Sequence, residues 1–346
     1  MNSILVTGGT GFIGSHTSLL LLKKGYTIYI VDSNINSSKS VIDNIQLIMK
    51  QRGLNISNKL NFINSDINNL DKLDEIFQIA NNKKEPIKSV FHFAGLKAVN
   101  ESIEYPLKYW NNNVSGTLTL LKTMKKHDCT NMIFSSSATI YSSKAKTPIT
   151  EQSEIGPINP YGNTKVTIEN ILSDLYKSNP RKWNIANLRY FNPIGAHPSG
   201  LLGEDPIGKP NNIFPLINLV ASKELKEITI YGNDWNTPDG TCIRDYIHVM
   251  DLAEGHIAAL KYLEQNEPKV INLNLGTGKG TSVLELINIF QKVNNINIPF
   301  SIGLRRDGDN ENVVANNFLA CNLLDWEPKR SLEDMCKDGW KSKNKS

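Results

Sequence analysis

The sequence predicts an α/β fold in which a doubly wound parallel sheet is joined to a smaller mixed α/β region. Two observations support this prediction. Short runs rich in β-branched residues alternate with longer helical patterns through the first half of the chain. With 346 residues, the chain is also long enough to bury a large core, in one large domain or two closely associated domains.

Five strand–helix pairs account for the first 190 residues. The expected strands are SILVTG (3–8), TIYIVDS (27–33), LNFINSD (60–66), SVFHFAG (89–95) and NMIFSSS (131–137). The expected helices begin near Phe12, run through IQLIMK (45–50), LDKLDEIFQIA (70–80) and LKYWNNNVSGTLTLLKTM (107–124), and begin again after Pro160. Such alternation places helices on both faces of a parallel sheet.

Beyond Tyr190 the pattern changes to a passage rich in Pro and Gly, from 191 to 212, which is typical of loops over a cleft. Further short elements follow, with strands at ITIYG (228–232) and VINLNLG (270–276) and helices after Asp251 and Ser282. We therefore expect a first domain over 1–190, a smaller domain over 191–340 that is interleaved with it, and a solvated tail over 341–346.

Composition and charge exclude several classes of function. The formal net charge is only +4, and Lys and Arg are interleaved with Asp and Glu, so we expect no nucleic-acid surface. The four cysteines form no C-x-x-C pair, which indicates neither a disulfide framework nor a zinc site. The longest leucine run, Leu19 to Leu22, is too short to cross a membrane. We expect a cytoplasmic protein without a membrane partner.

A glycine-rich turn follows the first expected strand and opens the first helix. The stretch TGGTGFIGS (7–15) satisfies G-x-G-x-x-G through Gly9, Gly11 and Gly14, and a second spacing begins at Gly8. Small residues let the backbone approach a pyrophosphate, and the helix N-terminus offers unpaired N–H groups. In this strand–turn–helix context the motif predicts a Rossmann-type dinucleotide site.

Acidic residues close the second and third strands. Asp32 lies about 20 residues beyond the turn, where a carboxylate accepts hydrogen bonds from the adenosine ribose and repels a 2′-phosphate. This position favours NAD over NADP. The alternative is that Asp32 only caps the next loop. Asp66 could bond the adenine side of the cofactor or could cap a helix.

Three further side chains suggest the chemistry. Ser137 ends the fifth strand, at the carboxyl edge of the sheet, where ligands bind in open α/β folds. Tyr161 and Lys165 are four residues apart, so they share one face of the following helix. A phenol is a poor base at neutral pH, but a nearby cation favours its ionised form. Because Y-x-x-x-K also occurs by chance on solvated helices, the pair gains its meaning from Ser137 and the glycine-rich turn. His92, a lone strand histidine without metal partners, is expected in the core.

At this point the chain resembles the extended short-chain dehydrogenase/reductase superfamily and, within it, the UDP-glucose 4-epimerase family. The similarity extends from Ile4 to about Trp340. It is carried by the strings HFAGLKAV (92–99), FSSSATIY (134–141), LRYFNPIGAHPSG (188–200), GEDP (203–206), GTCIRDYIHVMDLA (240–253) and RRDGD (305–309).

The resemblance implies roles for individual residues. Tyr161 would be the catalytic base and acid, and Ser137 would bond the sugar hydroxyl. Lys165 would bind the nicotinamide ribose and lower the pKa of the phenol, with help from the positive charge of the cofactor. The implied NAD pocket comprises Gly8, Gly11, Phe12, Ile13, Gly14, Asp32, Ser33, Asn34, Ile35, Asn36, Ser37, Asp66, Ile67, Phe93, Ala94, Gly95, Leu96, Lys97, Asn112 and Phe191, together with the three catalytic residues.

A UDP-hexose is the substrate that the resemblance implies. Besides Ser137 and Tyr161, its implied contacts are Asn192, Asn212, Tyr231, Arg244, Arg306, Asp309 and Val313. Guanidinium groups suit a diphosphate because they bind its oxygens bidentately. The alternative for Arg244 and Arg306 is a surface charge, and for Asn192 and Asn212 a turn former.

In the implied reaction, Tyr161 removes the proton of the sugar's 4-hydroxyl while a hydride passes to NAD⁺. The 4-keto sugar then turns its other face to the same NADH, and the hydride returns with inversion. Two alternatives remain. A nucleotide-sugar 4,6-dehydratase would need carboxylates at the positions of Ala138 and Thr139, and a non-catalytic NAD-sensing protein would have no need for Tyr161 and Lys165.

Two departures from the family pattern bear on substrate choice. IYSS (140–143) lacks the usual glycine after the tyrosine, at Ser142. Val313 stands where the family varies between a bulky tyrosine and smaller side chains, so the pocket is expected to accept UDP-GlcNAc and UDP-GalNAc as well as UDP-glucose and UDP-galactose. The resemblance also implies a homodimer built on the helices after Pro106 and Pro160.

Overall fold

A seven-stranded parallel sheet lies at the centre of the protein, in the order β11-β6-β5-β4-β1-β2-β3. The computed structural model describes residues 3–208, 210, 212–306 and 308–344. Residues 345 and 346 of the expected tail and Asp307 of the RRDGD string lie outside that part. The strands are β1 (Ser3–Thr7), β2 (Thr27–Asp32), β3 (Leu60–Asn64), β4 (Ile87–His92), β5 (Asn131–Ser137), β6 (Asn184–Tyr190) and β11 (Val270–Leu275).

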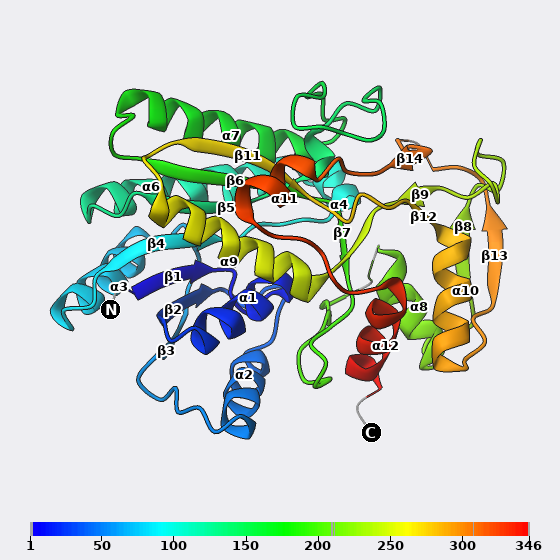
Figure 1. Cartoon of the computed structure of the whole chain (residues 1–346), viewed down its shortest axis with the longest axis horizontal. Helices are drawn as coiled ribbons and strands as arrows, with labels where there is room; N and C mark the ends of the chain where they lie inside the picture. Colours follow the sequence, from blue (N-terminus) through cyan, green and yellow to red (C-terminus); the bar gives the residue numbers. More distant parts are fainter. Residues whose placement is uncertain (1–2, 209, 211, 307, 345–346) are drawn as a thin grey trace.

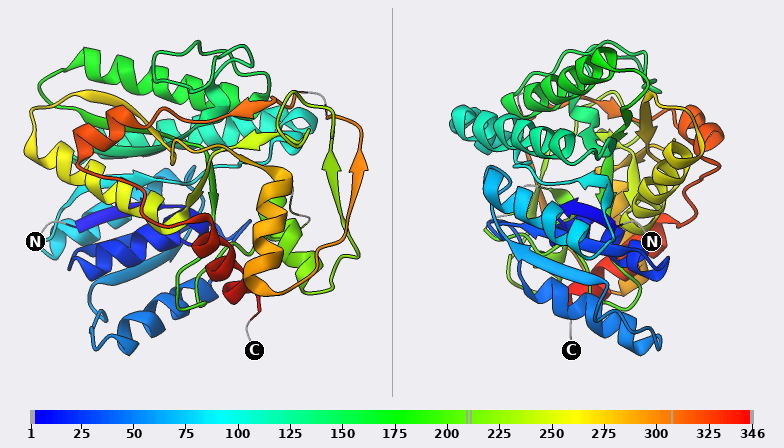
Figure 2. Two further views of the ribbon diagram at one scale, coloured as in Figure 1. Left: turned by 45° about the vertical axis from the view of Figure 1, so that its right-hand side comes forward. Right: turned by 90° about the vertical axis from the view of Figure 1, so that its left-hand side faces the viewer.

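Helices cover both faces of this sheet (Figures 1 and 2). On one face, α1 (Phe12–Lys23), α2 (Ser40–Gln51) and α9 (Val249–Gln265) share a core with inward residues of β1, β2 and β6. On the other face, α3 (Leu70–Asn82), α6 (Gly116–Lys126) and α7 (Pro160–Ser178) pack on alternate residues of the same strands. Successive strand residues point to opposite faces, so one strand serves both cores. The predicted doubly wound sheet is confirmed.

Three helices, α1, α7 and α10, begin where the sequence predicts. Gly11 caps α1, and Asn159 caps α7 by accepting a hydrogen bond from the Gly162 N–H at 2.9 Å. Pro160 occupies the first turn of α7, where its fixed φ and missing N–H are tolerated. The α10 helix follows Ser282, which forms a capping box with Glu285.

The segment 107–124 is not the single helix that we expected. It divides into α5 (Pro106–Tyr109), a π-helical turn (Trp110–Ser115) and α6, after the short α4 (Val99–Glu104). A π-helical turn holds an extra residue, and this changes which side chains face the sheet. As a result Asn113 is buried, whereas Asn112 is only half-buried.

The second half of the chain adds smaller sheets and their helices at one end of the molecule (Figure 1). The small sheets are β7 (Asn192–Ile194) with β10 (Tyr246–His248), β8 (Ile228–Tyr231) with β13 (Phe300–Gly303), and β12 (Thr281–Ser282) with β9 (Ile243–Arg244) and β14 (Asn312–Val313). The helices at this end are α8 (Ile213–Ala221), α10 (Val283–Asn294) and α12 (Leu332–Lys343), whereas α11 (Phe318–Leu324) packs in the core that contains α1 and α9. The α8, α10 and α12 helices share a core with β8.

The β11 strand belongs to a different sheet from the one that the sequence predicts. We assigned VINLNLG to the smaller region, but β11 pairs in parallel with β6 and completes the central sheet. The division at residue 190 remains a prediction, since the second half of the chain contributes to both parts of the fold. The α12 helix runs through Lys343, so residues 341–343 of the expected tail are helical.

Candidate active site

The carboxyl edge of the central sheet gathers most of the predicted cofactor residues. The glycine-rich turn follows β1, Asp32 ends β2, and Ser137 ends β5. Phe93 follows β4 and Phe191 follows β6. Because the strands are parallel, these positions lie along one edge of the sheet, which is where open α/β folds bind ligands.

The turn after β1 fits the backbone of a dinucleotide. Gly8 has a φ of +70°, and a Cβ there would lie 2.5 Å from the Ala94 backbone nitrogen. The turn therefore packs directly against the segment after β4. No side chain caps α1, and its first turn contains no acidic residue. The N–H groups of Phe12 and Ile13 thus stand at a positive helix end that suits a phosphate.

Asp32 connects this turn to the loop after β2. Its carboxylate accepts hydrogen bonds from the backbone N–H of Thr10 at 3.1 Å and of Asn34 at 3.0 Å. The hydroxyls of Thr10 and Ser37 are 2.7 Å apart. Thr10 was not among the predicted residues, although it stands inside the TGGTG string. In the same loop Ser33 and Asn34 are half-buried, whereas Ile35 and Asn36 are exposed.

Asp66 and Ile67 follow β3. Asp66 accepts a hydrogen bond from the Asn68 N–H at 2.7 Å, but Asn69, not Asp66, caps α3. The helix-cap alternative for Asp66 is therefore wrong. Ile67 is buried under Gly116 of α6, where a Cβ would come within 2.7 Å of the isoleucine.

A buried hydrogen-bond network supports the segment after β4. The Asn113 side chain accepts from the Leu96 N–H at 2.8 Å and donates to the Leu96 carbonyl at 3.1 Å. It also donates to the Thr164 hydroxyl at 3.1 Å, on the helix that bears Tyr161. Asn113 was missed because only Asn112 was carried over from the resemblance, and the π-helical turn decides which of them faces inward.

His92 lies in the core, as expected. Its two ring nitrogens lie 2.7 Å from the Thr7 hydroxyl and 2.8 Å from the Thr117 hydroxyl. Burial lowers the pKa of His92 to about 3, so the ring is neutral. Its two hydrogen bonds join β4 to β1 and to α6.

Tyr161, Lys165 and Ser137 converge at the centre of this edge. The Lys165 ammonium lies 5.8 Å from the centroid of the Tyr161 ring and donates a 2.7 Å hydrogen bond to the Ser135 carbonyl. All three side chains are buried. The Ser137 hydroxyl also accepts from the Thr139 hydroxyl at 3.0 Å.

The pKa of Tyr161 moves in the direction opposite to our expectation. Burial raises the pKa of the phenol, and a hydrogen bond from Ser137 lowers it in part. Burial also lowers the pKa of Lys165 to about 8, while the nearby Glu169 carboxylate raises it. We expected Lys165, helped by the positive charge of NAD⁺, to lower the pKa of Tyr161, but among the protein's own groups burial is the largest cause and raises it.

A second group of predicted residues gathers beyond this edge, on β8, β9 and the segment that includes β14. The Asp309 carboxylate lies 3.1 Å from Arg306 Nε and 3.7 Å from Arg244 Nη2. The Arg306 guanidinium lies 4.4 Å from the centroid of the Tyr231 ring. Val313 pairs in register with Arg244. The structure therefore brings Tyr231 and Arg244 together with the segment that holds Arg306, Asp309 and Val313, more than 60 positions further along the chain.

The remaining predicted residues lie around these two groups. The Asn192 N–H donates to the Asp245 carbonyl at 3.0 Å, next to Arg244. Asn212 is exposed and begins α8 without a side-chain cap hydrogen bond. Lys97 is exposed and forms an ion pair with Glu204 at 3.1 Å.

The serine at the departure from the family pattern fits its surroundings. Ser142 donates its backbone N–H to the Glu154 carbonyl at 2.9 Å. It packs against Gly156, where a Cβ would lie 3.1 Å from the Ser142 Cβ. The absence of a side chain at Gly156 thus leaves room for the one at Ser142, and the loop keeps regular backbone bonds.

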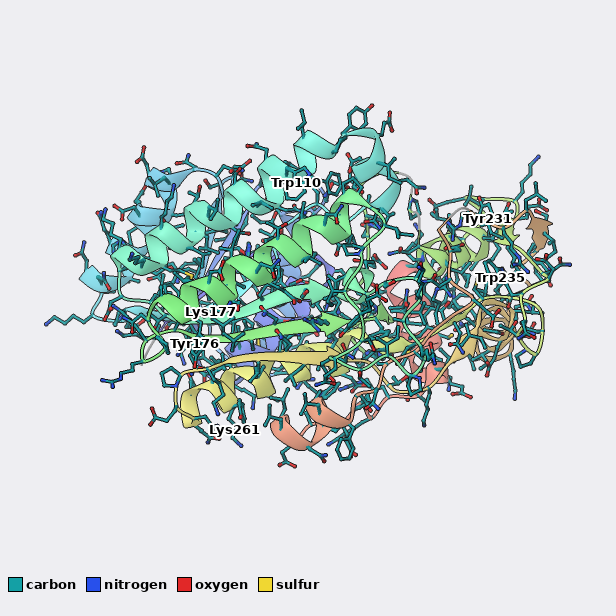
Figure 3. The ribbon with its side chains drawn as sticks, turned by 90° about the horizontal axis from the view of Figure 1, so that it is seen from above. Trp110, Tyr176, Lys177, Tyr231, Trp235 and Lys261 are labelled. Carbon is teal, nitrogen blue, oxygen red and sulfur yellow. The ribbon has the colours of Figure 1, made fainter. Side chains whose placement is uncertain are left out.

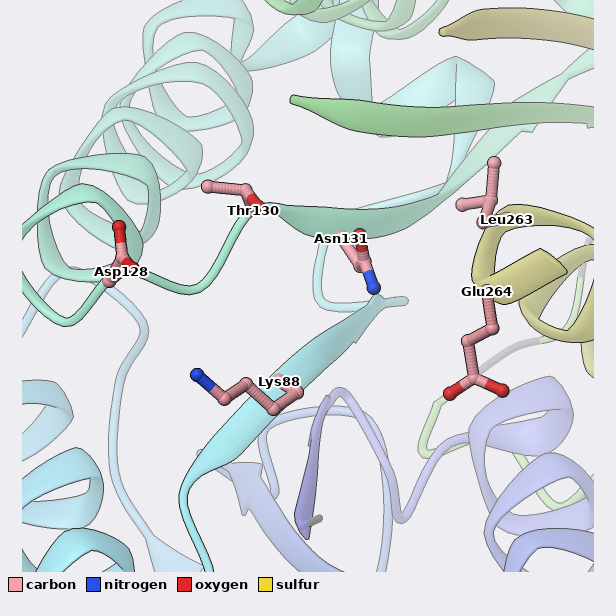
Figure 4. A pocket seen from close by; sticks show the side chains of 6 residues that line it. All are labelled: Lys88, Asp128, Thr130, Asn131, Leu263 and Glu264. Carbon is pink, nitrogen blue, oxygen red and sulfur yellow. The ribbon is translucent and has the colours of Figure 1, made fainter. Parts of the chain in front are cut away.

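A hollow of about 650 Å³ lies at the opposite edge of the sheet (Figure 4). It is lined by Lys88, Asp128, Thr130, Asn131, Leu263 and Glu264. Asn131 begins β5, so the hollow opens at the amino ends of the strands. It contains none of the predicted site residues.

Comparison with known proteins identifies the family. The family model described as GDP-mannose 4,6 dehydratase matches residues 5–339. The chain is 48% identical over 338 residues to UDP-glucose 4-epimerase of Dictyostelium discoideum, covering 98% of this chain and 94% of that protein. The chain belongs to the UDP-glucose 4-epimerase family. The resemblance found in the sequence is confirmed.

Other members extend this comparison. The chain is 46% identical to the bifunctional protein GAL10 of Pachysolen tannophilus but spans only 48% of its length. It is 43% identical, with a TM-score of 0.92, to a UDP-glucose 4-epimerase from Bifidobacterium longum solved in complex with NAD⁺ and UDP, covering 99% of this chain and 98% of that one. It is 33% identical, with a TM-score of 0.82, to the UDP-Glc/GlcNAc 4-epimerase of Campylobacter jejuni, covering 100% of both chains.

Proposed function

We propose that this chain is an NAD-dependent epimerase that inverts C4 of a UDP-hexose through a 4-keto intermediate, interconverting UDP-glucose and UDP-galactose. The observation that carries the proposal is the convergence of Tyr161, Lys165 and Ser137 beside a glycine-rich turn. Family membership supports the same reaction.

NAD fits the residues of this edge. The close approach of Gly8 to Ala94 and the uncapped start of α1 suit a pyrophosphate. Asp32 is placed for the adenosine ribose and Lys165 for the nicotinamide ribose. When bound, NAD⁺ accepts and returns the hydride and brings a positive charge that favours the ionised form of the buried phenol.

Tyr161 acts as general base and then as general acid. In the first half-reaction the phenolate takes the proton from the 4-hydroxyl, and in the second it returns a proton to the 4-keto oxygen. Ser137 bonds the same oxygen and orients it. Burial of the phenol excludes water, which protects the keto sugar and strengthens the electrostatic contacts.

The nucleotide must anchor the substrate while the sugar ring turns. Arg244 and Arg306 supply two guanidinium groups for the diphosphate, and Asp309, which lies against both, suits the uridine ribose. Tyr231 offers a ring for the uracil. This anchor is separate from the catalytic group, so the hexose can rotate while the nucleotide stays bound.

A 4,6-dehydratase is the second candidate, since the matching family model carries that description. Elimination of water needs an added acid and base near C5 and C6. Ala138 and Thr139 follow Ser137 directly and carry no carboxylate. Their side chains therefore argue for epimerisation, because general acid–base groups contribute about 10²–10⁴-fold.

Val313 supports a wider substrate range that includes UDP-GlcNAc and UDP-GalNAc. It is half-buried and packs against the apolar cluster that contains Phe191 and Tyr141. A valine there leaves more space than a tyrosine would. Turnover of both substrate pairs tests the proposal, and activity confined to the unacetylated pair would refute the wider range.

The Tyr161→Phe variant tests the main proposal, because it keeps the ring and removes the proton-transfer group. Epimerisation should fall by about 10²–10⁴-fold, while the melting temperature and the amount of bound NAD stay near those of the unmodified protein. Full activity in this variant would overturn the assignment. An unmodified protein that converts UDP-glucose to a dehydrated sugar would instead support the dehydratase.

We also propose a cytoplasmic homodimer. Leu107 is 82% exposed and Ile103 is 62% exposed on the helices near Pro106, which leaves an apolar surface beside α7. The cysteines are unpaired, in keeping with a reducing compartment. No helix in the described ranges is both long and apolar enough to span a membrane. Sedimentation of a Leu107→Asp variant tests the dimer; an unchanged mass would refute this surface.

A further inference from the structure

The catalytic helix is joined to the central sheet by a buried ion pair. Glu169 of α7 and Arg189 of β6 meet in a bidentate contact, with Arg189 Nη2 2.6 Å from Oε2 and Nε 3.1 Å from Oε1 of Glu169. Their side chains are 9% and 6% exposed. Removing either partner of such a pair leaves an uncompensated buried charge, which is costly.

Glu169 reaches the strand that carries Ser137. Its Oε1 atom accepts a hydrogen bond from the Ser136 hydroxyl. Ser136 stands between Ser137 and Ser135, and the carbonyl of Ser135 accepts the bond from Lys165. Glu169 is also one turn beyond Lys165 on the same helix face. The Glu169 carboxylate thus contacts β5 at Ser136, between Ser135, whose carbonyl binds Lys165, and Ser137.

Arg189 extends the network to the segment that follows Ser137. Its Nη1 atom donates to the Tyr141 hydroxyl and to the Glu151 carbonyl, each at 3.1 Å. Tyr141 in turn donates to the Asn274 side chain at 2.6 Å, on β11. The network therefore links α7, β5, β6 and β11 within one buried set of contacts.

Lys165 depends on this network for its nearby negative charge. The titratable and charged groups around Lys165 and its partners are Tyr161 and Glu169 on α7, His92 on β4, Arg189 on β6, which contacts Glu169, and Tyr190 on β6, which contacts Ser135. His92 is neutral and Tyr190 is held protonated by burial. Glu169 is thus the carboxylate in this set, and its negative charge acts on two cations, Lys165 and Arg189.

We propose that Glu169 and Arg189 are positioning residues for the catalytic centre: Glu169 holds β5 and the Lys165 ammonium in place under Tyr161, and Arg189 fixes Glu169 against β6. This inference rests on the proposed function. Removing the carboxylate leaves two buried cations, which favours neutral Lys165. Removing the guanidinium leaves Glu169 to act on Lys165 alone, which favours charged Lys165.

The test compares Glu169→Gln with Arg189→Met in the NAD-bound protein, across the pH range. If charged Lys165 is required, the alkaline limb of the kcat profile should move down by about one pH unit in Glu169→Gln and up in Arg189→Met. Arg189→Lys keeps the charge and should leave the limb close to its original position. Asp174→Asn, on the exposed face of the same helix, is the matched control and should shift nothing.

A second measurement does not use activity. Burial lowers the pKa of Lys165, so its contribution to stability grows as pH rises from its folded pKa of about 8 towards its unfolded value. Melting temperatures across the pH range measure this change in stability. Relative to the unmodified protein, the rise in stability should begin at lower pH in Glu169→Gln and at higher pH in Arg189→Met.

The outcomes separate the two proposals. Opposite shifts in the two variants support positioning and charge balance. Lower melting temperatures with unmoved pH profiles would mean that the pair is only structural and would overturn this inference. If one variant does not fold, the sign of the shift in the other still decides. An unmodified protein without epimerase activity would overturn the proposed function, and the melting measurement would still test the pair.

Discussion

Val313 on β14 is paired in parallel register with Arg244 on β9. The residue proposed to set the size of the sugar pocket is therefore held beside a residue proposed to bind the diphosphate. A change of side chain at Val313 can alter the space for the hexose while the backbone pairing keeps Arg244 in place.

We expect Val313→Tyr to narrow the substrate range. The larger ring would occupy space at the apolar cluster that contains Phe191 and Tyr141. The kcat/KM for UDP-GlcNAc should fall at least about tenfold, which corresponds to about 1.4 kcal/mol, while that for UDP-galactose changes little. Turnover assays with both sugars check this. Equal losses for the two sugars would mean that Val313 does not discriminate between them.

Two arginine–aromatic stacks lie at the expected uridine end. Arg305 lies 4.0 Å from the Trp235 ring centroid and donates to the Asp234 carboxylate at 2.7 Å. Trp235 in turn donates to the Tyr231 carbonyl at 3.3 Å, and Figure 3 shows both aromatic residues together at one end of the molecule. Arg305 therefore supports the strand that carries Tyr231.

We expect Arg305→Ala to raise KM for the UDP-sugar by about fivefold with kcat nearly unchanged, because a lost stack of about 1 kcal/mol weakens uridine binding but not the chemistry. Steady-state kinetics measures this split. Arg181→Ala, at an exposed turn between α7 and β6, is the control. A fall in kcat alone would contradict a role at the uridine end.

Gly8→Ala should abolish NAD binding and destabilise the protein. The new Cβ would meet the Ala94 nitrogen at 2.5 Å in a backbone with a φ of +70°. Gly53→Ala is a matched control, because Gly53 has a φ of +71° with open space around it. We expect a loss of about 1–2 kcal/mol for the control, from backbone strain alone, and a larger loss for Gly8→Ala. Thermal unfolding and bound-NAD content measure both effects, and equal losses would argue against close packing of the turn.

Buried neutral histidines should make the protein sensitive to acid. Burial lowers the pKa of His92 to about 3 and that of His256 to about 4. The unfolded chain binds protons at these histidines below about pH 6.5, whereas the folded chain does not, so the free energy of unfolding falls as pH drops from about 6.5 to 4. The expected slope is up to about 1.4 kcal/mol per histidine per pH unit.

Denaturant unfolding at a series of pH values measures that slope. The His256→Phe variant keeps a ring between Phe93 and Tyr190. In this variant the slope of the unfolding free energy against pH should lose the contribution of one histidine. An unchanged slope would show that His256 is not a source of acid sensitivity.

The local pattern was sufficient for much of the fold. Five strands and their helices could be predicted because β-branched runs and helical periodicity are local signals. The convergence of Ser137 and Tyr161 followed from topology, since the ends of parallel strands share an edge. That Arg244 and Asp309 lie together was predicted from the family resemblance, because no local signal joins residues so far apart in the sequence.

Three features could not be predicted from local sequence. The pairing of β11 with β6 depends on long-range contacts. The burial of Asn113 depends on the π-helical turn, which helix periodicity does not include. The direction of the pKa change at Tyr161 depends on the balance between desolvation and charge, which a spacing of four residues cannot give.

The place of β11 has a consequence for synthesis on the ribosome. β6 is buried along nearly its whole length, and its outer neighbour comes from a part of the chain about 85 residues further on, as the contact between Asn187 and Asn272 marks. While that later part is still being translated, β6 is an open apolar edge of the kind that pairs with other chains. A released fragment that ends after Tyr190 should therefore bind chaperones or aggregate, and extending the fragment through Leu275 should reduce this.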